Sequence, residues 1–418
     1  MGALEASQSV YDVLCRVSTA SPPRMRAWNG DSWGPSGAPA TIVLNHPGAL
    51  RSMLLPPNDL SAGEAYLYGD IDLEGEILPV LEFAATFENP GPTVQQRLQL
   101  MRALRSLPAG TGPPRPGRPI MRGLLHSLRR DRAAITYHYD TGNEFFATFL
   151  DPSMVYSCGY FLDPTEDLDK AQERKLDVIC RKLDLRPGER LLDVGCGWGA
   201  LSLHAAEHYG CEVTGITLSE EQAAYAGAWA AERGLEDRCG FEVQDYREVT
   251  GRFEKISSVG MFEHVGRAKL GVYFSRLRAL LAPGGLALNH GITTRDRSKH
   301  LWNRPTFVNT YVFPDGELHP VELSLAKAEA AGFEVRDLES IRESYTLTLR
   351  HWVKNLESNT DAAVSATNER VFRIWRLYMA GSAVAFDRAA ISVYQMLLAD
   401  PARPWTFGRR RLLATDDA

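Results

Sequence analysis

The stretch LLDVGCGWGALSLHAAEHYG, residues 191–210, decides how the rest of the sequence is interpreted. Its apolar start predicts a short strand, and the residues after Gly199 have the composition of a helix. Three alternating glycines, Gly195, Gly197 and Gly199, separate the two. Glycines in a strand-to-helix turn let the backbone approach a ligand closely, so we predict a ligand-binding turn here.

The segments that follow keep alternating between strand-like and helix-like patterns. This alternation predicts an α/β fold with a doubly wound, mostly parallel sheet. Ligands of such sheets bind at the carboxyl ends of the strands, and the glycine turn follows the first strand. The predicted strands are 190–194, 211–218, 241–246, 253–260 and one after a Pro-Gly-Gly turn at 283–285, with helices at 200–210 and 220–234.

A proline- and glycine-rich stretch, SLPAGTGPPRPGRP at 106–119, interrupts the chain and has no apolar period. Before it, residues 40–54 predict a strand and then a helix, and residues 63–84 predict a compact turn that leads into a helix. We therefore predict a smaller N-terminal α+β domain over 1–107, a linker over 108–133 and the α/β domain over 134–418.

Arginines gather at the end of this linker, and only Asp131 opposes them. Two interpretations stay open for them. They form a solvated helix face, or they contact anionic lipid headgroups, at about 1 kcal/mol per basic residue near the surface. The arginines are Arg115, Arg118, Arg122, Arg129, Arg130 and Arg132.

Composition limits the classes of function. The chain has 418 residues, enough for two or three domains, and a net charge of −6, which does not favour a nucleic-acid partner. Six scattered cysteines without a C-x-x-C pair argue against a zinc site and a disulfide framework. No apolar run has the length of a membrane span, and the N-terminus lacks signal-peptide features, so we expect a soluble, cytoplasmic protein.

The spacing of the glycine turn indicates which nucleotide it binds. A dinucleotide site needs G-x-G-x-x-G and a carboxylate after the second strand for the ribose. Here Asp193 precedes a G-x-G-x-G turn, and the second strand, EVTGITLS, ends without an acidic residue. S-adenosylmethionine has no phosphate, and its zwitterionic end suits backbone amides and carbonyls. The turn therefore favours S-adenosylmethionine over NAD.

Six motifs carry a resemblance to a known family: MVYSCGYF, LLDVGCGWG, VTGITLSEEQ, QDYRE, SVGMFEHVG and YVFPDGEL, in this order. Together they resemble the cyclopropane-fatty-acyl-phospholipid synthase family, which includes mycolic acid cyclopropane synthases and related lipid C-methyltransferases. The resemblance runs from Ala134 to the end of the chain and implies a class I, Rossmann-like methyltransferase sheet. GEAYLYGDIDLEGE, at 63–76, is similar to the extra lipid-facing domain of the members that act on phospholipids.

The resemblance also implies a cofactor site. Tyr156 and Ser157 match the family's YS pair, and Asp245 and Tyr246 fall where the family contacts the adenine end. Trp198 is expected to pack beside the cofactor. The S-adenosylmethionine residues implied in this way are Tyr156, Ser157, Asp193, Gly195, Cys196, Gly197, Trp198, Gly199, Thr217, Leu218, Ser219, Gln222, Asp245 and Tyr246.

The family's general base is a bicarbonate ion, and its catalytic positions map onto Cys158, Glu263, His290, Ile292 and Tyr345. A small buried anion costs several kcal/mol unless hydrogen bonds hold it. Backbone amides of Cys158 and Ile292, an imidazole and a phenol can donate those bonds, and Glu263 would orient His290 or accept a proton. Each residue alone also has a structural explanation, such as a buried thiol or a helix cap, so the prediction rests on the joint pattern.

The reaction implied is methyl transfer from S-adenosylmethionine to the double bond of an unsaturated acyl chain. The carbocation then loses a proton to bicarbonate and closes a cyclopropane ring, whereas loss of another proton leaves a methylene group. Two departures from the family's sequence pattern leave open whether the product is a cyclopropane or a methylene group. Ser382 replaces a Cys of mycolic-acid members, and IRESYTLTLRHW at 341–352 is nearer the actinobacterial form, which includes methylene-adding enzymes.

Aromatic faces could stabilise the cation. The candidates are Tyr156, Tyr160, Phe161, Phe262, and the helically spaced Phe372, Trp375, Met379 and Phe386, which could equally be core residues.

The expected partners are unsaturated phospholipid acyl chains and, transiently, the inner face of an anionic membrane, with a homodimer also open. Two other classes of function are alternatives. A methyltransferase for a small oxygen or nitrogen nucleophile would not need the bicarbonate positions. A non-catalytic lipid-binding module would have no reason to keep both these positions and the glycine turn.

Overall fold

The structure is a computed structural model that describes residues 2–87, 91–110, 112–113, 130, 141–295 and 305–403. Contacts divide the chain into two units. The predicted domain boundaries at 107 and 133 stay predictions, and the first unit also takes in two later segments. The first unit comprises Met1–Ile120, Asn303–Pro314 and Leu356–Val384, and the second comprises Met121–Trp302, Asp315–Asn355 and Ala385–Ala418.

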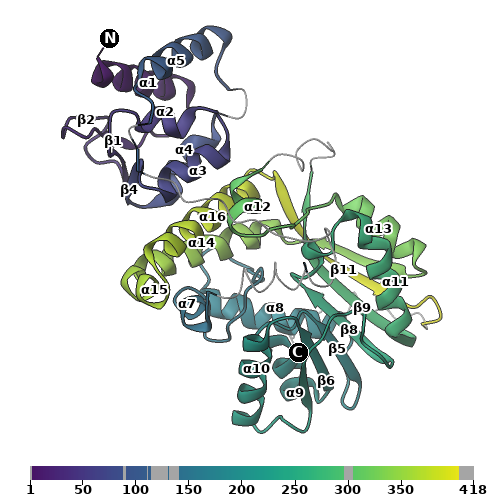
Figure 1. The fold of residues 1–418 in the computed structure, drawn as a ribbon. Coiled ribbons are helices and arrows are strands. Elements are labelled where there is room, and N and C mark those ends of the chain that lie inside the picture. The colour runs from purple at the N-terminus through teal and green to yellow at the C-terminus, as the bar shows by residue number, and fades with distance from the viewer. Residues whose placement is uncertain are drawn as a thin grey trace. The chain divides into compact units, whose positions relative to one another are not determined.

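The first unit contains a four-stranded sheet in the order β2-β1-β3-β4 (Figure 1). The compact turn predicted within 63–84 is wrong in part, because a strand, β4, lies between two helices there. Ile71 and Leu73 of β4 are buried and pair with β3. The elements of this unit are α1 Ala3–Val17, β1 Arg24–Arg26, β2 Ser32–Trp33, β3 Ala40–Leu44, α2 Ala49–Leu54, α3 Asp59–Leu67, β4 Ile71–Gly75, α4 Ile77–Ala85, α5 Val94–Ser106, α12 Phe307–Tyr311, α15 Thr360–Ala366 and most of α16 Glu369–Asp387.

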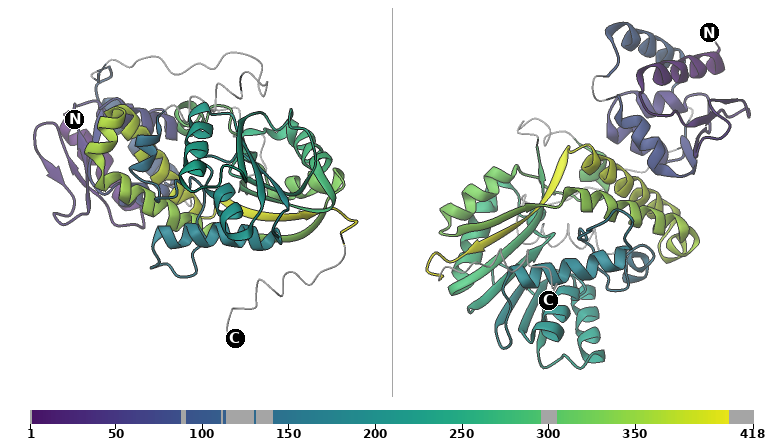
Figure 2. Two further views of the ribbon diagram at one scale, coloured as in Figure 1. Left: turned by 90° about the horizontal axis from the view of Figure 1, so that it is seen from below. Right: turned by 180° about the vertical axis from the view of Figure 1, so that it is seen from behind.

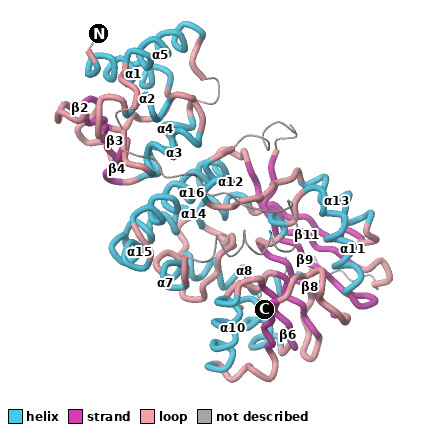
Figure 3. Tube along the Cα trace, in the orientation of Figure 1, coloured by secondary structure: helices cyan, strands magenta, loops and turns pink. Residues whose placement is uncertain are grey.

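The second unit is built on a seven-stranded sheet in the order β10-β11-β9-β8-β5-β6-β7 (Figure 3). Only β11 runs antiparallel to its neighbours, so the predicted doubly wound, mostly parallel sheet is confirmed. Its elements are α7 Asn143–Ala147, α8 Leu168–Lys182, β5 Arg190–Val194, α9 Ala200–Tyr209, β6 Glu212–Thr217, α10 Glu220–Glu232, β7 Cys239–Val243, β8 Phe253–Val259, the 3-10 turns η1 Phe262–His264 and η2 Arg267–Lys269, α11 Leu270–Leu280, β9 Leu281–Thr294, α13 Val321–Ala330, β10 Glu334–Ser340, most of α14 Arg342–Ser358, and β11 Ile391–Ala399.

The predicted Pro-Gly-Gly turn at 283–285 lies inside a strand. Strand β9 begins at Leu281, which pairs with Phe253 of β8. The next pair is Leu286 with Lys255, so the pairing register between the two strands shifts here. Gly284 has a φ of +73° there, a backbone conformation that glycine tolerates. The irregularity lets a turn-like sequence stay in the sheet.

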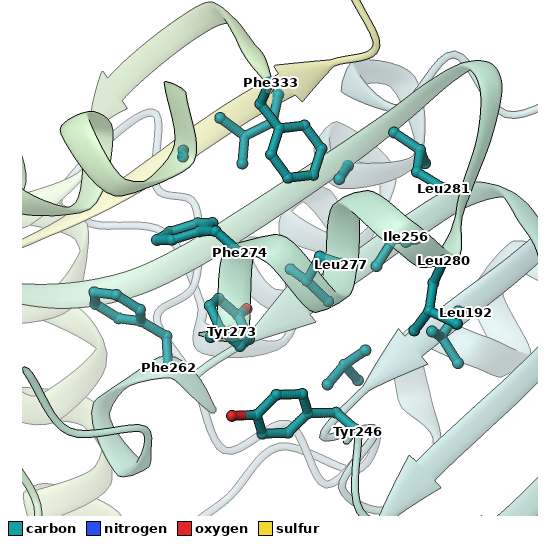
Figure 4. Packing of buried hydrophobic residues seen from close by; sticks show 14 of the residues in the cluster. Leu192, Tyr246, Ile256, Phe262, Tyr273, Phe274, Leu277, Leu280, Leu281 and Phe333 are labelled. Carbon is teal, nitrogen blue, oxygen red and sulfur yellow. The ribbon is translucent and has the colours of Figure 1, made fainter. Parts of the chain in front are cut away.

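Helices cover both faces of the sheet of the second unit (Figure 2). Successive strand residues point to opposite faces, so Leu191 packs in a cluster with α8 and α9, and Leu192 packs in one with α11. Figure 4 shows the second cluster, to which α11 contributes Phe274 and Leu277 and β8 contributes Ile256. The two clusters hold the sheet rigid beneath the carboxyl ends of its central strands.

Within the described part of the chain, we find no helix that is both long and apolar enough to span a membrane.

Candidate active site

A pocket lies at the carboxyl ends of β5, β6 and β8, where the glycine turn predicted it. Gly195, Gly197 and Gly199 have φ angles of +80°, +56° and +91°, which L side chains rarely adopt. A Cβ on Gly195 would also lie 2.9 Å from Cβ of Met261, which lines the pocket. The glycines are therefore needed for the shape of this pocket.

Asp193 fixes the end of the central strand. Its Oδ1 accepts from the Ser257 hydroxyl and its Oδ2 from the Ser202 hydroxyl, both at 2.8 Å. The side chain is buried, and burial raises the pKa of its carboxyl. Asp193 lines the pocket, but these two bonds give it a structural role that joins β5 to β8 and α9.

Two of the fourteen predicted cofactor residues do not line the pocket. Gly199 is the N-cap of α9, and Ser219 is the N-cap of α10, where its hydroxyl accepts from the Gln222 amide at 3.3 Å. Both fix where these helices begin, and the Ser219 amide also donates to the hydroxyl of Thr217, which lines the pocket, at 3.2 Å. The twelve that line it are Tyr156, Ser157, Asp193, Gly195, Cys196, Gly197, Trp198, Thr217, Leu218, Gln222, Asp245 and Tyr246.

Several polar side chains that line the pocket are already paired with each other. Thr217 Oγ1 donates to Gln222 Oε1 at 2.8 Å. The Asp245 carboxylate accepts two hydrogen bonds, each of 2.7 Å, from the Arg247 guanidinium, which also lies 5.4 Å from the centre of the Tyr246 ring. These pairs fix the side chains in one orientation before a ligand arrives.

Sequence analysis missed three charged or titratable residues that line this pocket, Lys175, Arg247 and His264. Lys175 is buried, and its Nζ donates to Ser157 Oγ at 3.0 Å. Burial lowers the pKa of this ammonium to about 8. In its helix, LDKAQERKLDVICRK, Lys175 lies four residues after Ala171 and four before Ile179, both of which are buried. The apolar period of the helix is therefore the sequence signal that could have identified it.

Aromatic side chains connect the pocket with Tyr345. Trp198 donates from Nε1 to Asn143 and packs on Phe146, with 4.9 Å between ring centres. Phe146 contacts Tyr156, which stacks on Trp352 at 5.2 Å, and Trp352 contacts Tyr345 at 6.1 Å. These five rings, from Trp198 to Tyr345, form a continuous aromatic path, and Trp198 is a packing residue, as predicted.

The other aromatic candidates lie in different surroundings. Tyr160 donates to Glu339, and Phe161 stacks on His351. Phe262 packs on the ring of His319. The helically spaced residues Phe372, Trp375, Met379 and Phe386 are all buried, and Phe386 contacts Tyr345 with 4.5 Å between ring centres.

Glu263 has a buried carboxyl group and lies in the turn η1, four residues after the end of β8. Its Oε1 accepts from the Ile292 amide at 2.7 Å, so this amide already has a protein acceptor. Among the residues that the structure describes, its Oε2 has no hydrogen-bond partner. Burial raises the pKa of Glu263 to about 7. Its neighbours Met261 and His264 line the pocket while Glu263 does not.

The remaining predicted catalytic residues are buried near Ile292. Ile292 pairs with Val393 across the sheet, and the Val393 carbonyl accepts from the amide of Ile341. The Ile341 carbonyl in turn accepts from the Cys158 thiol at 3.7 Å and from the Tyr345 amide at 3.3 Å. Burial raises the pKa of the Cys158 thiol.

His290 lies on β9, two residues before Ile292, and is 2% exposed. Burial lowers the pKa of its imidazole to about 3, and the charges of Lys175 and Lys182 act in the same direction. Of the five predicted residues, only Glu263 and Ile292 contact each other directly, and Cys158 and Tyr345 are linked to them only through Ile341 and Val393. None of the five lines the pocket. Within the described ranges, no cluster of His, Cys, Asp or Glu could hold a metal ion.

The sheet order and the glycine turn define the class: a class I S-adenosylmethionine-dependent methyltransferase fold. Comparison with known proteins narrows the class. The family model for mycolic acid cyclopropane synthetase matches residues 126–396. The chain belongs to this family and is an enzyme of the S-adenosylmethionine-dependent C-methyltransferase type.

Individual relatives agree with this family. A probable fatty acid methyltransferase of Pseudomonas putida is 39% identical over 399 residues, which cover 92% of this chain and 95% of the relative. The cyclopropane-fatty-acyl-phospholipid synthase of Escherichia coli K12 is 36% identical over 278 residues, 65% of this chain and 69% of that protein. A crystal structure of mycolic acid cyclopropane synthase CmaA1, complexed with SAH and CTAB, aligns with a TM-score of 0.61 and 33% identity over 64% of this chain and 98% of that one.

Proposed function

We propose that this enzyme transfers a one-carbon group from S-adenosylmethionine to the double bond of an unsaturated phospholipid acyl chain and forms a cyclopropane ring. The observation that carries the proposal is Glu263, a buried carboxyl group beside the donor pocket with one oxygen that lacks a partner among the described residues. A methyltransferase for an oxygen or nitrogen nucleophile could use one general base, but it would not need a set of bicarbonate ligands.

The pocket residues fit S-adenosylmethionine. The glycine turn lets the backbone approach the ligand, and the buried ammonium of Lys175 can face the cofactor's carboxylate. When bound, S-adenosylmethionine supplies an electrophilic methyl group. The task of the chain is then to hold the methyl donor and the alkene in line and to exclude water.

The chemistry requires the chain to tolerate a cation. The alkene carbon forms a bond to the methyl carbon as the sulfur–carbon bond breaks, which leaves a positive charge on the acyl chain. Aromatic faces attract a cation without reacting with it, and ring contacts run from Trp198 and Tyr156, which line the donor pocket, to Tyr345, one of the predicted catalytic residues.

Ring closure then needs a base. The electron pair of a C–H bond of the added methyl group forms the second ring bond, and its proton leaves. Bicarbonate would supply this base, and the residues fit such an ion because Glu263 Oε2 and the His290 ring retain hydrogen-bonding capacity in a buried site. Glu263 would hold the ion in position through its oxygen without a protein partner.

We also propose contact with an anionic membrane. The arginine cluster predicted for this contact lies outside the described residues, except for Arg130, which pairs with Asp315 at 2.5 and 2.7 Å. Helix α5 supports the contact instead. Val94 and Leu98 are 76% and 56% exposed on one face of this helix, which carries three arginines and no acidic residue.

Incubation of the purified enzyme with S-adenosylmethionine and vesicles of an unsaturated phospholipid tests the proposal. We expect the mass of the acyl chain to rise by one CH2 group, and we expect Glu263→Gln to reduce the rate at least about 100-fold. The control is the same enzyme with vesicles of a saturated phospholipid. Equal methyl consumption on saturated lipid, or full activity of Glu263→Gln, would contradict the proposal.

A further inference from the structure

His290 contacts an amide side chain whose orientation can be determined. His290 on β9 and Gln395 on β11 are directly opposite each other in the antiparallel ladder. Nε2 of Gln395 lies 3.3 Å from Nδ1 of His290. Both side chains are buried, with exposed fractions of 0% for Gln395 and 2% for His290. The direction of this hydrogen bond therefore decides which nitrogen of His290 carries the proton.

A lysine determines how the Gln395 amide is oriented. Nζ of Lys182 lies 2.8 Å from Oε1 of Gln395. An ammonium group can only donate hydrogen bonds, so the end of the amide that faces Lys182 must be the carbonyl oxygen. The NH2 end then faces His290.

Acidic residues of β10 hold this lysine in place. Lys182 is 4% exposed and forms ion pairs with Glu339 and with Asp337, the latter at 3.7 Å. The other oxygen of Glu339 accepts from the Tyr160 hydroxyl at 2.7 Å. Glu339 and Asp337 hold Lys182, and Lys182 in turn holds Gln395. The amide of Gln395 therefore cannot reverse without leaving a buried ammonium opposite an NH2 group.

The donor facing Nδ1 selects one form of the imidazole. A neutral histidine has one N–H and one nitrogen with a lone pair. If Gln395 donates to Nδ1, that nitrogen carries the lone pair and Nε2 carries the hydrogen. The doubly protonated ring would direct an N–H at the NH2 group of Gln395 and is disfavoured. The lowered pKa of His290 agrees with this neutral form.

We propose that Lys182 and Gln395 are positioning residues that hold His290 as its Nε2–H tautomer. His290 then donates a hydrogen bond from Nε2 to a bound anion and cannot accept a proton there. Among the described residues, no side chain or carbonyl binds Nε2, so this donor is available. The inference rests on the proposed function only in naming that anion as bicarbonate.

Nitrogen NMR of the histidine rings tests the tautomer directly. In the 15N-labelled wild-type enzyme, the His290 signals are those that disappear in His290→Gln. We expect Nδ1 to have the shift of an unprotonated nitrogen and Nε2 that of a protonated one. In Gln395→Glu, a carboxylate replaces the NH2 group, and we expect Nδ1 to become protonated. A wild-type His290 with its hydrogen on Nδ1 would overturn the inference.

A matched variant separates positioning from packing. Met396→Leu changes a buried residue of the same strand that pairs with Asn289 rather than with His290, and we expect wild-type ring signals. If Gln395→Glu does not fold, Lys182→Met replaces it. Without the ammonium, the Gln395 amide is free to reverse, and we expect both tautomers in the spectrum. Wild-type signals in Lys182→Met would contradict the role of Lys182.

Titration with bicarbonate distinguishes this inference from the proposed function. We expect added bicarbonate to shift the His290 Nε2 signal in the wild-type enzyme, and about tenfold more bicarbonate to be needed in Gln395→Glu. An Nε2–H tautomer whose signal does not respond to bicarbonate would support the positioning role of Gln395. The same result would overturn the proposed base.

Discussion

At the scale of single residues, Glu263 combines burial with the chemical role that we propose for it. Its folded-state pKa of about 7 lies above its ordinary value of 4.5. Such a group favours folding fully below pH 4.5 and loses that contribution as the pH rises through 7. We therefore expect Glu263→Gln to gain stability relative to the wild type over this window, by about 3 kcal/mol at its upper end. Urea unfolding at several pH values measures the difference.

Glu254 provides the control, because its pKa is shifted in the opposite direction to that of Glu263. It lies on the same stretch of chain, at the start of β8, and its hydrogen bonds with Arg190 lower its pKa. Its contribution is present above its ordinary pKa and is lost only in more acidic solution. Glu254→Gln should therefore differ from the wild type by a constant amount between pH 5 and 7. A stability gap for Glu263→Gln that does not change with pH would contradict a neutral, buried Glu263.

At the scale of elements, the turn between β5 and α9 determines whether the donor binds. Gly195→Ala places a Cβ at a φ of +80° and 2.9 Å from the side chain of Met261. We expect weaker S-adenosylhomocysteine binding, by tenfold or more in calorimetry, and a loss of about 1–2 kcal/mol of stability.

Gly227→Ala is the control, because this helical glycine of α10 has no atom within 4 Å of an added Cβ. It should bind normally and be more stable by about 0.5–1 kcal/mol. Equal binding by the two variants would contradict the importance of the turn.

The same scale shows what can be predicted from sequence. Alternating glycines, apolar strands and capped helices are local signals, so the five strands from β5 to β9 and the position of the pocket could be predicted. β10 and β11, which complete the sheet, were not predicted. β4 was missed because its acidic residues and glycine resemble a turn, and only pairing with β3 makes it a strand. The contact of Lys175 with Ser157 and that of Gln395 with His290 depend on tertiary packing between separate segments, which one sequence does not reveal.

At the scale of the whole molecule, the proposed phospholipid substrate would lie in a bilayer, where the enzyme would have to reach it. The exposed face of α5 offers Val94 and Leu98 together with Arg97, Arg102 and Arg105. We expect Leu98→Glu to reduce binding to anionic phosphatidylglycerol vesicles about tenfold in a flotation assay, because it removes apolar contact and adds repulsion. Gln99→Glu on the same helix adds the charge alone and should have a smaller effect. Equal binding by both variants and the wild type would exclude α5 as the contact.

The central claim concerns the product, and one measurement tests it most directly. The enzyme is expressed in a host with unsaturated membrane lipids, and proton NMR spectra of the extracted fatty esters are recorded. The account predicts upfield signals of cyclopropane protons, absent from a strain that expresses Glu263→Gln. Mass cannot replace this measurement, because the cyclopropane and methylene products are isomers. Downfield methylene protons would contradict ring closure, and unchanged lipids would contradict transfer to an alkene.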